Sequence, residues 1–436
     1  MQSLEIIVVS PYSPKWSNIG SIRWEKLAKY LSKRHKITLI TSAFPEKGYE
    51  RSYDIGNANL IEVPLKFYWK NPYTLSKQNT REYNSRISFL RKLKAELRVP
   101  LERVFPISSG GMLCHDMNSY KREIEKLISK EKTTVLITTY DPWFTLKLGN
   151  YFKRRYEKLF WIADFRDPSF GIHESKLSNL PLFRMQTKKI LRLSDLITVV
   201  TKYMQQSYSE LTSKKVIFLP NGYDGSLHFG ESSNKIKKEN HLSIAYTGSL
   251  HPKTREISYF VTVLEKVTTI SPQVKVSFNY AGFQADIVEA EFSKRKLGKI
   301  LNNHGFLKRD QALKLQKQAD ILLLIAYTGD DPEIGKSIRT GKVYEYLASG
   351  KPILAIAPRD WEMKEEIECD GVSKVFDKNQ IDEMAQYLVD LARRQKIEIN
   401  FQKRKEVIEK YLYKNLALQL ERELESLVRE RERDQL

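Results

Sequence analysis

Short runs of apolar residues alternate along this chain with stretches in which apolar residues recur every three or four positions. A first series of such runs lies at residues 4–9, 36–41, 134–138, 160–163, 196–201 and 216–219. A second series lies at residues 242–246, 274–281, 322–325 and 353–356. Apolar runs of this length are typical of strands buried on both faces of a parallel sheet, and their alternation with helical patterns predicts an α/β fold. Two series predict two Rossmann-like, doubly wound domains.

The length of 436 residues also favours two domains, because one hydrophobic core rarely organises so long a chain. A polar stretch at 226–241 has the composition of a linker. We therefore place an N-terminal domain at 1–232, with a basic insertion at about 66–130, and a second domain at 233–402. Residues 403–436 are highly charged with an imperfect apolar stripe, which predicts a C-terminal helix that packs on the N-terminal domain or mediates self-association.

The stretch R-T-G-K-V-Y-E-Y-L-A-S-G-K-P-I, residues 339–353, predicts a short helix that begins at Gly341 and leads into a buried strand. The first N–H groups of a helix lack partners and carry partial positive charge, to which Lys342 adds a full charge. Glu345 lies one turn further on, and its side chain leans back toward the same end. The pattern indicates a cradle for an anion beside an acceptor for hydroxyl groups. The alternative is an ordinary amphipathic helix on which both charges are merely solvated.

Three aspartates follow predicted strands of the N-terminal domain. Asp141 lies in the turn after 134–138, and Asp164 and Asp167 lie in the phrase F-W-I-A-D-F-R-D-P. Ligands bind at the carboxyl ends of strands in open parallel sheets. Carboxylates there could act as general bases that remove a proton from a substrate hydroxyl. The alternative for D-F-R-D is an Asp–Arg pair that caps the loop.

A formal net charge of +20 calls for an anionic partner, and nucleotide sugar, nucleic acid and acidic lipid all qualify. Residues 66–103 are the most basic part and are interleaved with aromatic residues, which favours docking on an anionic membrane; the alternative is a solvated helical insertion. No nucleic-acid-binding signature accompanies the charge, so no specific nucleic acid is expected.

The chain has only two cysteines, which excludes a disulfide framework and argues against a cysteine zinc site, and we expect no bound metal. The sequence shows no leader pattern and no apolar run near 18 residues, so we expect a cytoplasmic protein. If the protein docks on a membrane, we expect it at the inner face.

The K-x-x-E-Y-L-A-S-G-K-P-I run resembles the donor-binding signature of group 1 (family 4-like) retaining glycosyltransferases. The phrases W-I-A-D-F-R-D-P, L-P-N-G-Y-D and Q-A-D-I-L-L-L are also similar to segments of that family. The resemblance covers the second domain well and the first in patches. It implies the GT-B fold, in which two Rossmann-like domains face a cleft. It also implies that Glu345 binds the ribose hydroxyls of a nucleotide sugar and that Lys342 meets its diphosphate.

The resemblance extends to other glycines and cations. It implies that Gly20, in the first loop, lets the backbone approach the donor phosphate, and that Asn221 of L-P-N-G-Y-D contacts the sugar or backbone; a turn without chemistry is the alternative for Asn221. Gly248 forms the turn that opens the second domain. Many members have Arg immediately after this glycine, whereas Ser249 stands here, so the diphosphate role falls to Arg255 or Lys253, with Arg255 favoured.

One departure concerns catalysis. Many members carry a second Glu eight residues before the helix Glu, where this chain has Ser337. We expect metal-independent transfer, with retention, from a nucleotide diphosphate sugar to a glycan or lipid-linked acceptor in bacterial-type cell-surface polysaccharide synthesis. Beyond this donor substrate no cofactor is expected. The alternative is a degenerate transferase that binds glycan or nucleotide sugar as a scaffold.

Overall fold

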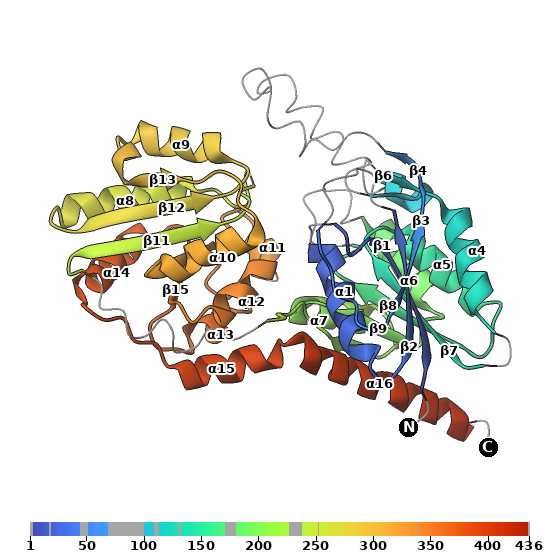
Figure 1. Cartoon of the computed structure of the whole chain (residues 1–436). Helices are drawn as coiled ribbons and strands as arrows, with labels where there is room; N and C mark the ends of the chain where they lie inside the picture. Colours follow the sequence, from blue (N-terminus) through green and yellow to red (C-terminus); the bar gives the residue numbers. More distant parts are fainter. Residues whose placement is uncertain are drawn as a thin grey trace. The chain divides into compact units, whose positions relative to one another are not determined.

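The computed structural model describes residues 3–16, 19–43, 51–68, 100–108, 113–129, 132–170, 180–225, 238–251, 253–336 and 338–434. They form two compact units (Figure 1). Unit 1 comprises Met1–Asp224 and Tyr413–Leu436, and unit 2 comprises Gly225–Leu412. The predicted first boundary at 232/233 lies a few residues beyond the start of unit 2.

Unit 1 is built on a seven-stranded sheet in which all strand pairs are parallel. In spatial order the strands are β10 (Val216–Phe218), β9 (Leu196–Val199), β8 (Leu159–Phe165), β7 (Thr134–Tyr140), β1 (Glu5–Tyr12), β2 (Lys36–Ser42) and β3 (Asn59–Val63). A small antiparallel sheet adds β4 (Leu65–Tyr68), β6 (Leu113–His115) and β5 (Ile107–Ser108). The apolar runs predicted as strands are all strands here.

Helices cover both faces of this sheet. Ile6 and Val8 of β1 lie in one core cluster with Trp24 and Leu27, whereas Ile7 and Val9 lie in another. The helices are α1 (Ile19–Leu31), α4 (Met117–Leu127), α5 (Phe144–Lys153), α6 (Pro181–Leu191), α7 (Lys202–Leu211) and α16 (Tyr413–Asp434). In Figure 1, α1 and α16 lie on one side of the sheet and α4 and α5 on the other. Because successive strand side chains point to opposite faces, a run such as I-I-V-V fills both cores.

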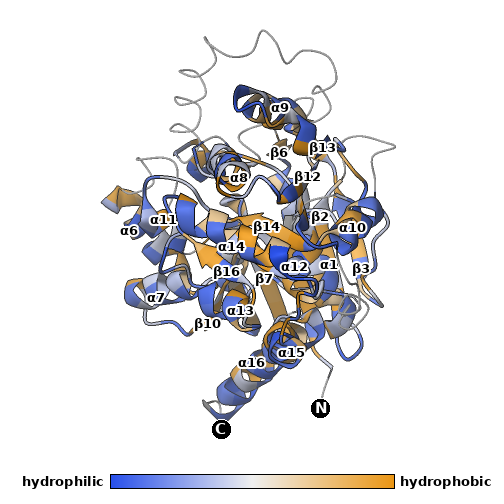
Figure 2. Cartoon of the chain, turned by 90° about the vertical axis from the view of Figure 1, so that its left-hand side faces the viewer, coloured by the Kyte–Doolittle hydropathy of each residue, from blue (hydrophilic) through white to orange (hydrophobic). Residues whose placement is uncertain are grey.

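Unit 2 has a six-stranded parallel sheet. Its order is β13 (Leu301–Asn303), β12 (Lys275–Ala281), β11 (His241–Thr247), β14 (Ile321–Ile325), β15 (Ile353–Ile356) and β16 (Lys374–Phe376). In Figure 2, β14 carries the hydrophobic colour, in contrast to the mixed colours of helices such as α10 and α14. The α/β class and the doubly wound parallel sheets predicted from the sequence are confirmed.

The helices of unit 2 include the predicted motif helix. They are α8 (Ser258–Ile270), α9 (Ala285–Lys294), α10 (Arg309–Gln318), α11 (Pro332–Lys336), α12 (Gly341–Ala348), α13 (Lys364–Glu368), α14 (Ile381–Arg393) and α15 (Phe401–Lys410), with a 3₁₀ turn at Gly298–Ile300. α12 begins at Gly341 and ends before Gly350, which has a positive φ of 69°, as expected for a helix stop. The tail predicted at 403–436 comprises two helices, of which α15 belongs to unit 2 and α16 to unit 1.

Candidate functional site

The N-terminal end of α12 is the centre of the candidate site in unit 2. Val343, Tyr344 and Leu347 are buried and fix the helix against the sheet. The N-cap residue, Thr340, makes no side-chain capping bond to the helix. The first turn therefore offers backbone N–H groups to an anion.

Gly248 and Lys342 approach each other closely although they are distant in the sequence. Gly248 follows β11, and its N–H donates to the carbonyl oxygen of Ala281 at 2.7 Å. A Cβ atom on Gly248 would lie 2.0 Å from Cε and 2.5 Å from Nζ of Lys342. Any side chain at 248 would therefore displace the Lys342 ammonium from its position at the helix end.

Lys342 lies among other charges. Burial lowers the pKa of its ammonium below the ordinary lysine value; Glu345 opposes this shift, and the positive charges of Arg255 and Arg309 add to it. Arg255 and His251 form an isolated antiparallel β-bridge. Burial, and after it the charge of Arg255, lowers the pKa of His251 to about 4. The charges of two arginines and one carboxylate thus act on Lys342, an arrangement suited to an anionic ligand that also carries hydroxyl groups.

Two side chains of α10 hold Glu345. Arg309 contacts Glu345 Oε2 at 3.1 Å, and Gln316 Nε2 donates to Oε1 at 2.7 Å. Gln316 is 1% exposed, and the same Nε2 donates to Thr247 Oγ1 at 2.9 Å. Gln316 therefore links Glu345 to the carboxyl end of β11 and restricts where the carboxylate points.

The C-terminal end of α12 is held by a buried network centred on Arg404 of α15. Arg404 pairs with Asp370, and both side chains are fully buried. Arg404 Nη1 also donates to the carbonyl oxygens of Tyr346 and Leu347, each at 3.4 Å. A cation at this end satisfies carbonyl groups that the helix leaves unpaired and complements its dipole.

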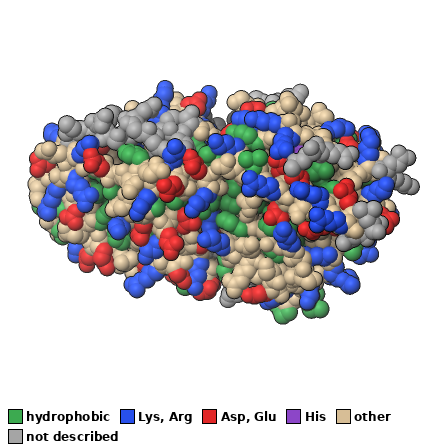
Figure 3. Space-filling view, turned by 90° about the horizontal axis from the view of Figure 1, so that it is seen from below, with side chains coloured by type: hydrophobic (Ala, Val, Ile, Leu, Met, Phe, Trp, Pro, Cys, Tyr) green, Lys and Arg blue, Asp and Glu red, His purple; other side chains and the backbone are tan. Residues whose placement is uncertain are grey.

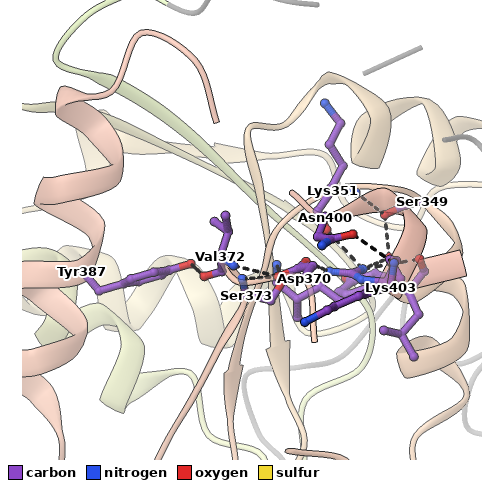
Figure 4. Close-up of polar contacts among 12 residues, drawn as sticks. Ser349, Lys351, Asp370, Val372, Ser373, Tyr387, Asn400 and Lys403 are labelled. Carbon is purple, nitrogen blue, oxygen red and sulfur yellow. Dashed lines mark hydrogen bonds and ion pairs between the residues drawn. The ribbon is translucent and has the colours of Figure 1, made fainter. Parts of the chain in front are cut away.

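Figure 4 shows how the loop around Asp370 completes this network. Asp370 Oδ1 accepts from the N–H groups of Val372 at 2.9 Å and Ser373 at 2.7 Å. The Asn400 N–H donates to the Asp370 carbonyl at 2.9 Å, which ties the start of α15 to the same loop. The network therefore holds the C-terminal end of α12, while buried side chains hold the helix against the sheet.

Lys253 lies in the loop before α8, near the other predicted cation. It has a positive φ of 70°, and its backbone N–H donates to Glu256 Oε1 at 2.8 Å. Its side chain is exposed, whereas Arg255 is partly buried. The charge of Arg255, like that of Arg309, acts on Lys342, whereas no such effect involves Lys253. The predicted diphosphate roles of Arg255 and Lys253 stay predictions.

Asp164 lies within β8 of unit 1 and is fully buried. Arg23 binds it through Nη2 at 2.8 Å, and it accepts further hydrogen bonds from Trp24 Nε1, Thr139 Oγ1 and Thr198 Oγ1 at 3.0, 3.1 and 2.6 Å. Burial alone would raise the pKa of Asp164, but the charge of Arg23 and these hydrogen bonds outweigh it and hold the pKa below the ordinary range. These contacts favour a structural role over the predicted catalytic one.

Asp141 and Asp167 lie at the carboxyl ends of neighbouring strands, as predicted. Asp141 directly follows β7 and is buried, whereas Asp167 follows β8 and is exposed. The Tyr12 hydroxyl donates to Asp141 Oδ2 at 3.4 Å, and Arg166 Nη2 donates to the Asp141 carbonyl at 3.0 Å. These groups form a polar cluster at the carboxyl ends of β7 and β8, where a hydroxyl substrate could be bound and deprotonated.

Gly20 and Asn221 lie in unit 1. Gly20 is the second residue of α1 and is buried. Asn221 is 8% exposed and follows Pro220, whose carbonyl accepts from Arg23 Nη1 at 2.8 Å. Their predicted contacts with a donor remain predictions.

Some predicted features lie outside the described residues. These are Ser337, most of the basic segment 66–103, and residues 226–237 of the linker. In the part of the chain that is described, no group of three or more His, Cys, Asp or Glu is arranged to hold a metal ion. None of the described helices is long and apolar enough to cross a membrane. On the face shown in Figure 3, Lys and Arg are interspersed with Asp and Glu.

Arg309, Gln316 and Arg404 were not singled out by the sequence analysis. Arg309 and Gln316 are seven residues apart on α10, so both project from one face of that helix. That spacing within R-D-Q-A-L-K-L-Q was a signal that the two could act on one partner. Nothing in the sequence pointed from Arg404 to α12, because their contact depends on the packing of α15.

Two doubly wound parallel sheets, each in its own unit, constitute the GT-B fold of glycosyltransferases. Comparison with solved structures shows that the chain has this fold. The sequence matches no protein-family model and no curated protein sequence.

The structural similarity extends over nearly the whole chain. Sucrose-phosphate synthase from Thermosynechococcus elongatus has a TM-score of 0.63 and 13% identity over 98% of this chain and 99% of its own. S. aureus TarM, in a complex with fondaparinux, α-GlcNAc-glycerol and UDP, has a TM-score of 0.62 and 11% identity over 98% and 100%. The α,α-trehalose 6-phosphate synthase of Burkholderia multivorans has a TM-score of 0.63 and 10% identity, over 100% of this chain and 99% of its own.

Proposed function

We propose that the chain is a glycosyltransferase that moves a sugar from a nucleotide diphosphate sugar to a glycan or lipid-linked acceptor. The observation that carries this proposal is the convergence of Lys342, Arg255 and Glu345 at the open N-terminal end of α12. The GT-B fold and the UDP in the TarM complex support a nucleotide sugar as donor.

Each group at this end of α12 has a role in the proposed donor site. The helix N–H groups, Lys342 and Arg255 bind the diphosphate, and Gly248 leaves room for the Lys342 side chain. Glu345 accepts hydrogen bonds from the ribose hydroxyls, because Gln316 and Arg309 occupy only part of its acceptor capacity.

Negative charge grows on the diphosphate as the bond to the sugar breaks. Lys342 and Arg255 stabilise that charge more strongly in the transition state than in the bound donor, which is how they accelerate transfer. Because these cations come from the chain, we propose metal-independent transfer. We propose retention of configuration from the resemblance of the motif at 342–353 to retaining glycosyltransferases. In unit 1, Asp141 and Asp167 are the proposed acceptors of the proton from the sugar acceptor's hydroxyl.

The proposed setting is bacterial-type cell-surface polysaccharide synthesis on the cytoplasmic side. A lipid-linked acceptor would bring the protein into peripheral contact with an anionic membrane. The alternative proposal is a degenerate transferase that binds donor or glycan without transfer, and Ser337 in place of the family's second Glu favours it.

A panel of nucleoside diphosphates and their sugars tests both proposals. Specific binding at 100 times the dissociation constant would stabilise the fold by about 2.7 kcal/mol, a measurable shift in melting temperature. Release of nucleoside diphosphate from one of the stabilising sugars supports transfer. Stabilisation without turnover on any donor and acceptor pair supports the scaffold, and no stabilisation by any of them contradicts both.

A further inference from the structure

Unit 1 exposes large apolar side chains on two helical segments. One segment is Leu180 with the first turn of α6, and the other is residues 100–105, of which 100–104 are helical. The exposed fractions are 44% for Leu180, 54% for Leu182, 66% for Met185, 41% for Leu101, 66% for Val104 and 53% for Phe105. We call these six residues the apolar surface.

The two segments pack against each other through Arg103. The Arg103 guanidinium lies 3.4 Å from the centre of the Trp143 ring and 5.3 Å from that of Phe183 on α6. Arg103 Nη1 donates to Thr187 Oγ1, also on α6, at 3.4 Å. Leu101 and Val104 flank Arg103 in sequence, so the exposed side chains of both segments belong to one region of unit 1.

The helix α6 already has a separate face for the core. Phe183, Thr187 and Leu191 are buried at i, i+4 and i+8 spacing. Leu182 and Met185 project from the other side, so they are not needed to attach α6 to its own unit. They are available to a partner.

The exposed charges of α6 have one sign. Residues 181–192 contain Arg184, Lys188, Lys189 and Arg192, all exposed, and no Asp or Glu. In the other segment Glu102 is only 4% exposed. On the outward face of α6, the apolar side chains of Leu182 and Met185 lie near the start of the helix with Arg184, and the exposed cations at 188, 189 and 192 follow them.

We propose that the apolar surface and the four cations of α6 dock unit 1 on an anionic lipid bilayer. The apolar side chains enter the boundary between headgroups and acyl chains, while Arg and Lys extend to the lipid phosphates. A protein partner fits less well, because lysine is depleted at protein interfaces and here Lys188 and Lys189 are exposed on the same helix as the apolar side chains. This inference deepens the membrane contact of the proposed function and rests on it for its setting.

Vesicle flotation of the full chain tests the surface. Vesicles of neutral phosphatidylcholine are compared with vesicles that contain phosphatidylglycerol, at low and at moderate salt. We expect binding to the anionic vesicles only, weakened by salt.

Two paired variants separate the contributions. Lys188→Gln with Lys189→Gln should weaken binding about fivefold per charge removed. Leu182→Ser with Met185→Ser should weaken it at least as much by removing the inserted groups. Lys275→Gln with Lys299→Gln, and Ile270→Ser with Leu418→Ser, change exposed residues of the same kinds elsewhere and should leave binding unchanged.

Three outcomes would overturn the proposal. They are no binding of the native chain to anionic vesicles, equal losses in the control variants, and loss only in the charge variant. Self-association of the native chain that Leu182→Ser with Met185→Ser abolishes, without vesicle binding, would assign the surface to a second copy instead. Melting temperature checks the fold of each variant, and stabilisation by nucleoside diphosphates, measured in parallel, keeps this result distinct from that of the donor site.

Discussion

Both units contain an arginine paired with a carboxylate, but the two pairs differ in surroundings. In unit 1, Arg23 and Asp164 are 2.8 Å apart and neither side chain is exposed. In unit 2, Arg309 and Glu345 are 3.1 Å apart, with 59% and 18% of the side chains exposed. The distances are similar, so distance does not separate a structural pair from a candidate binding site.

What separates the pairs is the remaining capacity to bind. Asp164 already accepts from Arg23, Trp24 and two threonines on neighbouring strands, and no face of it reaches solvent. Glu345 has two protein partners, one of which is a solvent-exposed arginine that can move away. A carboxylate at the carboxyl end of a strand therefore indicates a binding or catalytic role only if its hydrogen bonds within the protein leave acceptor capacity for a ligand.

The largest effect is expected at the buried pair. Asp164→Asn leaves the Arg23 charge buried without a counterion, which should lower the free energy of unfolding by about 3–5 kcal/mol. Urea denaturation measures this. Asp167→Asn, at an exposed position nearby, should change it by less than about 0.5 kcal/mol. A similar small change for Asp164→Asn would return Asp164 to the list of candidate catalytic groups.

Lys342→Ala should lower turnover about 10²-fold or more with the melting temperature retained, because it removes a charge that stabilises the departing diphosphate. Single-turnover kinetics with the active donor measure the effect. Lys299→Ala, on an exposed part of unit 2, is the matched control. Unchanged turnover in Lys342→Ala would contradict the proposal that Lys342 stabilises the departing diphosphate.

The affinity for nucleoside diphosphate should also depend on pH through Lys342. Burial lowers the pKa of this ammonium, so the charged form, and with it full affinity, exists below the lowered pKa and is lost as pH rises through it. An ordinary lysine would keep its charge to about pH 10.4. Calorimetry across the alkaline range should show this decline in the native chain and a flatter profile in Lys342→Arg. Parallel profiles would contradict the prediction.

Gln316→Leu should reduce selectivity for ribose rather than abolish binding. A hydrogen bond to a charged group contributes about 1.5–3 kcal/mol. Without the hydrogen bond from Gln316, the Glu345 carboxylate is no longer held in the direction of the ribose. The native chain should bind a 2′-deoxy or 3′-deoxy nucleotide about tenfold more weakly than the ribonucleotide, and the variant should lose most of this difference. Gln318→Leu is the control on the exposed end of α10. If the ratio persists in Gln316→Leu, Gln316 does not orient Glu345.

The smallest effect is expected for Arg309→Gln. An exposed ion pair contributes at most about 1 kcal/mol, so the free energy of unfolding should change by less than that, in contrast to the buried pair of unit 1. Urea denaturation of this variant beside Asp164→Asn tests the comparison directly. Equal losses would show that exposure is a poor guide to the role of these pairs.

The sequence predicted the strands well because both sheets are parallel and buried on two faces. The run 353–356 coincides with β15, and the helix from Gly341 is α12, since glycine and proline define its ends. The convergence of Lys342 and Glu345 followed from helical spacing alone. Their approach to Gly248 depends on how β11 and α12 lie next to each other, which spacing along the chain does not encode.

The roles of polar residues were harder to predict from their types. Asp164 looked catalytic because it ends an apolar run, yet its partners come from α1, β7 and β9 and lie up to 141 residues away in the chain. Likewise Arg404 gave no sign of a link to α12. Contacts made at long range by packing, rather than local patterns, decide whether a charged group is satisfied.

The chain enters unit 1, leaves it for unit 2, and returns to unit 1 only with α16. Leu416, Leu420 and Leu424 of α16 lie in the same core cluster as Ile6 and Leu39 of the first strands. During synthesis on the ribosome, unit 2 can therefore complete its fold while the sheet of unit 1 still has an uncovered apolar face. The first unit to be translated is the last to be finished.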